Sequence, residues 1–322
     1  MTLATRPRLR WLLVTALLLA ATAPLVVALA SLSGHDHRWV DLLAQFVGPA
    51  LVAALVSMGL ALLLRSRLAT AATALTVTLT FAAGAPQWFP ARGWSAAEPG
   101  FTLYFANLFV GNDDIAAITQ SIDQADPDIV VLIEVGDAPR AALYRALADY
   151  PYRASTPRHI GGAGPSTSLI ASRWPLTERP IELTHAFAIA AEVQTPSGVV
   201  TVAGAHLTRP WPYQYQWAQI IQAQELIQWS GEVTGPLVVA GDFNSVPSGR
   251  VGRLIRSEAG LIPAPGWPGT WPAFLPAWAG IAIDHVYRTP DLALIDRRLG
   301  RDNGSDHRPV VVRLTPATPP GA

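Results

Sequence analysis

Residues 236–247 read PLVVAGDFNSVP, and this stretch decides the fold that we predict for the chain. A short apolar run between Pro236 and Gly241 is typical of a fully buried strand. The run ends in Asp242 and Asn244, which are two residues apart and would point to the same face of an extended chain. The stretch therefore predicts a buried strand that delivers a carboxylate and an amide to the edge of a sheet.

Two interpretations of this pair stand side by side at this point. A carboxylate can orient or deprotonate a water molecule, and an amide can hold a phosphoryl oxygen without adding negative charge, which suits hydrolysis of a phosphate ester. Alternatively, Asp242 and Asn244 form an Asx turn that closes a core strand. The rest of the chain has to decide between them.

The composition is unusually apolar for a soluble enzyme. Half of the 322 residues are hydrophobic, and most of the excess lies before about residue 90. The absence of cysteine excludes disulfides and thiolate metal sites. All 23 basic residues are arginines, and residues 100–322 hold 16 of them against 20 acidic residues. This part of the chain therefore lacks the basic excess with which proteins grip a long nucleic acid.

Residues 1–90 predict a membrane anchor of three helices, because three apolar stretches are each long enough for a hydrocarbon core that takes about 20 residues. The stretches cover about residues 11–33, 42–64 and 68–88. Arginines before the first stretch and between the second and third favour the cytoplasm, which places everything after Trp88 outside. Alternatively, residues 1–30 are a cleaved signal peptide, because Ala28-Leu29-Ala30 fits a cleavage site. Both interpretations make the C-terminal domain extracytoplasmic.

A globular domain follows the anchor. Residues 91–100 predict a linker, residues 101–315 the domain, and the Pro/Ala/Thr-rich residues 316–322 a disordered tail. Strands alternate with helices in the pattern of a mixed α/β domain. We predict strands over 101–107, 129–133, 186–194, 199–206, 281–287, 292–299 and 310–314, and helices over 137–149 and 249–259.

An aromatic cluster precedes a further predicted helix that runs to about Trp229. Residues 211–217 read WPYQYQW, and we expect Trp217 to pack that helix onto a sheet. Exposed members of the cluster could instead lie in a membrane interface or contact a lipid-linked substrate.

Polar residues that can carry chemistry stand at the ends of the predicted strands. A carboxylate after an apolar strand is costly to bury unless it is paired or binds a cation, so Glu134 is either a metal ligand or a salt-bridged structural residue. His206 alone is either a packed core histidine or a site residue. Because only oxygen and imidazole donors are present, the set fits Mg²⁺ or Mn²⁺. The full set is Asn107, Glu134, His206, Asp242, Asn244, Asp284, Asp306 and His307.

These pieces, in this order, resemble the endonuclease/exonuclease/phosphatase superfamily. The Gly-Asp-x-Asn and Ser-Asp-His pieces make the resemblance specific, and it covers about residues 101–314. Ile133 is a departure, since many members have Gln before the metal-binding Glu. The matching pieces are Asn107, Ile133-Glu134-Val135, the run from Leu169 to Leu176, His206-Leu207, Gly241-Asp242-Phe243-Asn244, Ile283-Asp284-His285-Val286 and the run from Ser305 to Pro309.

The resemblance implies an α/β fold, a four-layered sandwich of two mostly antiparallel sheets flanked by helices. It also implies a divalent metal, Mg²⁺ or Mn²⁺. Glu134 looks like its principal ligand, with Asn107 and Asp306 helping to hold metal or phosphate.

The resemblance further implies in-line attack by water without a covalent enzyme intermediate. Asp242 would position or deprotonate the water, and Asn244 would bind the phosphoryl oxygens. His307, oriented by Asp284, would stabilise the charge that develops on phosphorus. His206 would contact phosphate or the leaving oxygen.

Membrane anchor and domain together indicate a Mg²⁺-dependent phosphohydrolase that acts at the outer membrane surface on a lipid-linked phosphate or pyrophosphate. The chain is similar to a membrane-bound branch associated with glycopeptide resistance, which is thought to act on polyprenyl pyrophosphate. The alternatives are an extracellular nuclease and a catalytically inactive binding module. A calcineurin-like metallophosphatase would need several more spaced histidines than the domain offers. The bilayer and the lipid substrate are the expected partners, nucleic acid is less favoured, and no protein partner is inferred.

Overall fold

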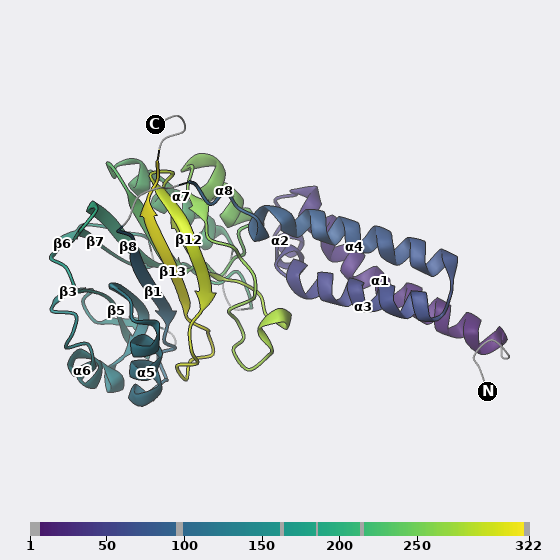
Figure 1. Ribbon diagram of the computed structural model, residues 1–322, viewed down its shortest axis with the longest axis horizontal. Coiled ribbons are helices and arrows are strands. Elements are labelled where there is room, and N and C mark those ends of the chain that lie inside the picture. The colour runs from purple at the N-terminus through teal and green to yellow at the C-terminus, as the bar shows by residue number, and fades with distance from the viewer. Residues whose placement is uncertain (1–6, 95–98, 162–163, 185, 213–215, 319–322) are drawn as a thin grey trace.

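The chain forms a bundle of apolar helices that extends from one side of an α/β domain (Figure 1). The computed structural model describes residues 7–94, 99–161, 164–184, 186–212 and 216–318. Parts of the predicted linker, of the aromatic cluster and of the tail lie outside these ranges, namely residues 95–98, 213–215 and 319–322.

Four helices make up the bundle. Among the described residues, α1 and α4 are each long and apolar enough to cross a membrane, and α2 with α3 forms a third candidate that is bent by 58°. The predicted second span is therefore not one straight helix. Pro49 lies in the first turn of α3, where a missing backbone donor costs nothing, so a new helix begins there. The helices are α1 Pro7–Ser33, α2 Arg38–Ala44, α3 Val47–Leu63 and α4 Arg67–Trp88.

Apolar side chains cover the outside of the bundle as well as its inside. Val14, Leu17, Ala61 and Ala69 are buried between the helices. Large side chains such as Leu63, 79% exposed, face outward, which is unfavourable in water but suits a hydrocarbon environment. The described part of the bundle thus has an apolar outer surface that is compatible with a bilayer.

Two mixed sheets form the α/β domain, and most of their strand pairs are antiparallel. The pairs β1–β2 and β8–β9 are parallel. The first sheet has the order β12-β13-β1-β2-β5-β3, with β4 beside β5, and the second has the order β10-β11-β9-β8-β7-β6. The strands are β1 Phe101–Asn107, β2 Ile129–Gly136, β3 Tyr152–Ser155, β4 His159–Gly161, β5 Gly164–Ser172, β6 Leu176–Arg179, β7 Phe187–Thr195, β8 Gly198–His206, β9 Leu237–Asp242, β10 Ile262–Pro263, β11 Asp284–Arg288, β12 Leu292–Leu299 and β13 Val310–Pro316.

The domain core lies between the two sheets. Phe105 and Val131 from the first sheet share one buried cluster with Val202 and Val238 from the second. Helices α5 and α6 pack on the outer face of the first sheet, and α7 and α8 on that of the second. This arrangement confirms the predicted four-layered sandwich. The helices are α5 Ile115–Ala125, α6 Asp137–Ala146, α7 Gln216–Gly231 and α8 Arg250–Glu258.

The segments on either side of the domain are fastened to it by hydrogen bonds. Arg288, fully buried, donates to the carbonyl of Ala91 at 2.6 Å and to that of Leu292 at 2.9 Å. At the other end, Ala317 donates to the carbonyl of Asp291 at 2.7 Å, beyond the end of β13 at Pro316. Residues 316–318 are thus ordered, which differs from the disorder predicted for the start of the tail.

Candidate active site

Strand register in the second sheet brings three of the predicted residues together. The parallel pairing of β8 and β9 sets His206 opposite Asp242. The antiparallel pairing of β9 and β11 sets Asp284 opposite Asp242 on the other side. Three distant segments therefore meet at one edge of the sheet because their apolar residues pair in this register.

A bulge in the first sheet aims Glu134 at the same place. The register of β2 against β5 shifts between Leu132 and Val135, so β2 runs through Glu134 and does not end there as predicted. Glu134 has φ of +52°, a left-handed conformation that is strained for a residue with a Cβ. Strain of this kind is held where a side chain needs a particular direction.

Two carboxylates converge in the site without a permanent positive charge between them. The Asn107 Nδ2 donates to Glu134 Oε1 at 3.1 Å and to Asp242 Oδ2 at 3.2 Å. The His206 Nε2 lies 3.4 Å from Glu134 Oε1 and 3.8 Å from Asp242 Oδ2. No arginine in the described part of the chain pairs with either acid. Such a pair of hard oxygen donors fits a divalent cation.

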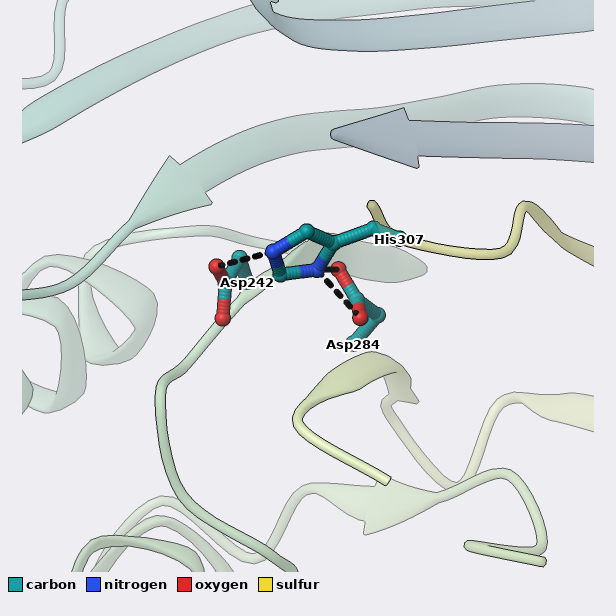
Figure 2. A group of neighbouring side chains, drawn as sticks. All are labelled: Asp242, Asp284 and His307. Atoms are coloured by element: carbon teal, nitrogen blue, oxygen red, sulfur yellow. Dashed lines mark hydrogen bonds and ion pairs between the residues drawn. The ribbon is translucent and has the colours of Figure 1, made fainter. Parts of the chain in front are cut away.

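His307 lies between two carboxylates, as Figure 2 shows. Its Nδ1 donates to Asp284 Oδ2 at 2.9 Å, and its Nε2 lies 3.9 Å from Asp242 Oδ2. Burial by itself lowers the pKa of His307, but the charge and hydrogen bond of Asp284 outweigh it and raise the pKa to about 10. Burial and the charge of Asp284 raise the pKa of Asp242 to about 6. Near neutral pH the pair is an imidazolium beside a carboxylate.

Asp242, Asp284 and His307 also have donor atoms within 4.8 Å of one another, which is close enough to hold a metal. However, Asp284 occupies the Nδ1 of His307, and the Nε2 faces Asp242. This trio therefore suits a carboxylate–imidazole–carboxylate arrangement better than a cation cage. Glu134 is the better anchor for a cation.

Asn107 and Asp306, the other two predicted metal residues, flank Glu134 and His307. The Asn107 Oδ1 accepts from the backbone N–H of Phe109 at 2.9 Å, so its amide nitrogen faces the acids. In that orientation Asn107 orients Glu134 through its amide nitrogen. Asp306 stands on the rim, where Trp271 Nε1 donates to its Oδ2 at 3.3 Å.

Asn244 lies beside the site, but not for the reason that the sequence suggested. Strand β9 ends at Asp242, and Asn244 has φ of +47°, so the alternation of an extended strand does not apply. The backbone N–H of Asn244 donates to Asp242 Oδ1 at 2.8 Å. Its side-chain Nδ2 donates to the carbonyl of Leu207 at 2.9 Å. Asp242 and Asn244 thus form the Asx turn that was one of the two interpretations, and this turn lies in the site.

Two residues that support the site were not among the predicted site residues. The Ser305 hydroxyl donates to the carbonyl of Asn107 at 2.8 Å and accepts from the N–H of His307 at 3.1 Å. Its place directly before Asp306-His307 was the available signal. Gln219, fully buried in α7, donates to the carbonyls of Phe243 and Asn244, and a glutamine in a helix carries no such signal.

Comparisons with known proteins agree with this architecture. A model described as the endonuclease/exonuclease/phosphatase family matches residues 105–307. Comparison with curated proteins gives no match.

Solved structures share the fold at low sequence identity. An endonuclease/exonuclease/phosphatase from Beutenbergia cavernae has a TM-score of 0.58 and 21% identity, over 70% of this chain and 74% of that one. The human Nocturnin catalytic domain with bound sulfate has a TM-score of 0.55 and 18% identity, over 72% and 98%. D. rerio TDP2 with a single-strand DNA product has a TM-score of 0.54 and 15% identity, over 68% and 100%.

Proposed function

Because the chain belongs to the endonuclease/exonuclease/phosphatase family, it is a metal-dependent phosphoric ester hydrolase, and we propose that it acts on a lipid-linked phosphate or pyrophosphate, such as polyprenyl pyrophosphate, at the outer surface of a membrane. The observation that carries the chemistry is the position of Asp242. Its carboxylate is buried between the Glu134–Asn107 pair and the His307 ring. A base and its charge-stabilising groups therefore meet at one point.

Asp242 is the group that positions and deprotonates the attacking water. With its pKa near 6 it is ionised at neutral pH and still basic enough to accept a proton. His307, protonated and held by Asp284, donates to a phosphoryl oxygen and stabilises the charge that develops there. Asn244 binds a second phosphoryl oxygen, and His206 stands toward the leaving oxygen.

Glu134 is the residue that would hold a divalent cation, Mg²⁺ or Mn²⁺, with Asn107 fixing its carboxylate and Asp306 beside His307 on the rim. When bound, such a cation neutralises the charge of the phosphoryl oxygens and polarises the phosphorus–oxygen bond. Glu134 pairs with no arginine in the described part of the chain and accepts from the neutral amide of Asn107, which supports this assignment.

The rim of the site supports an amphiphilic substrate. The loop between β10 and β11 touches the site at Asp306, whose carbonyl accepts from the N–H of Ala273 at 2.7 Å. The same loop exposes Phe274 at 82% and Trp278 at 52%. On its other side it meets the anchor, where a Cβ on Gly48 of α3 would lie 3.3 Å from the ring of Trp267. The loop therefore contacts both the site and the apolar bundle and carries exposed apolar side chains, which supports a substrate with an apolar part.

The test is release of inorganic phosphate from polyprenyl pyrophosphate by the purified full-length chain in detergent with Mg²⁺. Asp242→Ala should abolish release. Asp291→Ala replaces an exposed acid directly before β12 and should leave release unchanged. Single-stranded DNA, a phosphoinositide and sphingomyelin are assayed in parallel. Cleavage of DNA without any lipid turnover would favour the nuclease alternative, and no turnover on any substrate would favour an inactive binding module.

A further inference from the structure

Asp41, a residue of the membrane anchor, is buried against the catalytic domain. It lies in α2 and is 2% exposed. Its Oδ1 accepts from the backbone N–H of Arg250 at 2.6 Å, and its Oδ2 accepts from the side-chain Nε2 of Gln216. A buried carboxylate is tolerated only with such partners, so this contact is specific.

The two partners of Asp41 lie in two helices of the catalytic domain. Gln216 lies in the first described turn of α7, and Arg250 is the first residue of α8. The N-cap of α8 is Gly249, which has no side chain to accept from the first turn. Asp41 supplies that acceptor and a negative charge from more than 200 residues away, at the helix end where both are favourable. A Cβ on Gly249 would lie 3.2 Å from Asp41 Oδ1, so the glycine makes room for the contact.

Helices α7 and α8 enclose the loop that follows the proposed base. This loop follows Asp242 directly and runs to Gly249, whose N–H donates to the carbonyl of Val246 at 2.8 Å. One turn after Gln216, Gln219 donates to the carbonyls of Phe243 and Asn244 at 2.8 and 2.9 Å. The chain of contacts from Asp41 therefore reaches both ends of the loop.

We propose that Asp41 is a positioning residue for the hydrolysis, through which the membrane anchor holds the loop of residues 243–249, whose Asn244 N–H donates to Asp242, in its active conformation. This inference rests on the proposed function for its catalytic consequence. Asp36, three residues after α1, offers a matched comparison because it also contacts α8. It pairs with Arg250 and Arg253 at 3.6 and 3.4 Å, but its side chain is 62% exposed.

The experiment compares Asp41→Ala, Asp41→Asn and Asp36→Ala in the full-length chain. Turnover of the water-soluble diester bis(p-nitrophenyl) phosphate measures the site without lipid access. Asp41→Ala should lower kcat by about tenfold or more with little change in KM, because a displacement of the base by a fraction of an ångström suffices. Asp41→Asn keeps one acceptor and should recover part of kcat. Asp36→Ala should stay near wild type.

Hydrogen exchange supplies a readout that does not depend on activity. Amides of residues 243–250 should exchange faster in Asp41→Ala than in wild type or Asp36→Ala. Gln216→Ala should share the loss in kcat, and combining it with Asp41→Ala should add little because both act through one contact. The proposal is overturned if exchange and kcat are unchanged in Asp41→Ala, or if Asp36→Ala has an equal effect. An inactive wild type would refute the proposed function, while exchange would still decide whether Asp41 holds the loop.

Discussion

Replacing Asp284 with Asn tests the charge on His307, on which the proposed chemistry depends. Asp284 is 1% exposed and accepts from His307 Nδ1, and Asn keeps nearly the same shape without the charge. The ring should then lose the main group that favours its protonated form. The variant should fold, bind its cation through Glu134 and yet lose activity progressively as the pH rises above about 6.5.

The magnitude follows from the pKa of His307. Its value of about 10 exceeds the ordinary 6.5, a gap that corresponds to about 5 kcal/mol in favour of the imidazolium. If the variant returns the pKa to about 6.5, only about 3% of molecules carry the proton at pH 8, so the rate falls about 30-fold from titration alone. At pH 6 most molecules are protonated again, and the rate should approach that of wild type at the same pH.

The assay is phosphate release at saturating substrate between pH 5.5 and 9.5 for wild type, Asp284→Asn and the surface control Asp291→Asn. Wild type should rise through about pH 6 as Asp242 ionises and hold its rate toward the pKa of His307. The rate of Asp284→Asn should fall at a pH several units lower than the pH at which the rate of wild type falls. Equal impairment of the variant at pH 6 and pH 8 would refute the reasoning, because a lost proton could not then be the cause.

Three further outcomes are expected. Chelation by EDTA should abolish turnover, and Mg²⁺ or Mn²⁺ should restore it. Glu134→Gln should weaken Mn²⁺ binding, measured by calorimetry, by at least about tenfold. Unchanged affinity would mean that Glu134 does not bind the cation. Burial lowers the pKa of His285 to about 4 from 6.5, so the stability present above pH 6.5 should fall by about 3 kcal/mol as pH drops toward 4. In His285→Gln the melting temperature should fall less between pH 6.5 and 4 than it does in wild type. An equal fall in the variant and in wild type would contradict this prediction. Gly241→Ala would place a Cβ 2.2 Å from the carbonyl oxygen of Ala205, so it should lower the free energy of unfolding by at least about 1–3 kcal/mol. Gly231→Ala is the control: a Cβ there meets open space, so this variant should melt like wild type.

The sequence located the polar ends of strands because a buried run followed by a charged residue is a local pattern. Glu134, His206 and Asp242 each follow such a run, and the register of the sheets brings them together. The directions of these side chains were not predictable, since the bulge at Glu134 and the left-handed Asn244 depend on neighbouring strands.

Contacts between distant parts of the chain carried no sequence signal. Asp41 follows an anchor helix and looks like an ordinary loop acid, yet its partners lie 175 and 209 residues away. The short edge strands β3, β4, β6 and β10 were also missed, because strands of two to four residues show no clear alternation. Long buried runs were predictable, whereas pairings set by tertiary packing were not.

The mounting of the domain has a further consequence for which molecules it can reach. Arg288 binds the start of the predicted linker at Ala91, and Asp41 binds α7 and α8, so the helix bundle and the domain are joined at two places. With the bundle embedded in a bilayer, the acids would stay at one height above it. Such an enzyme would hydrolyse phosphates that lie at that distance from the bilayer. It would not reach phosphates that lie deeper in the bilayer or farther from it.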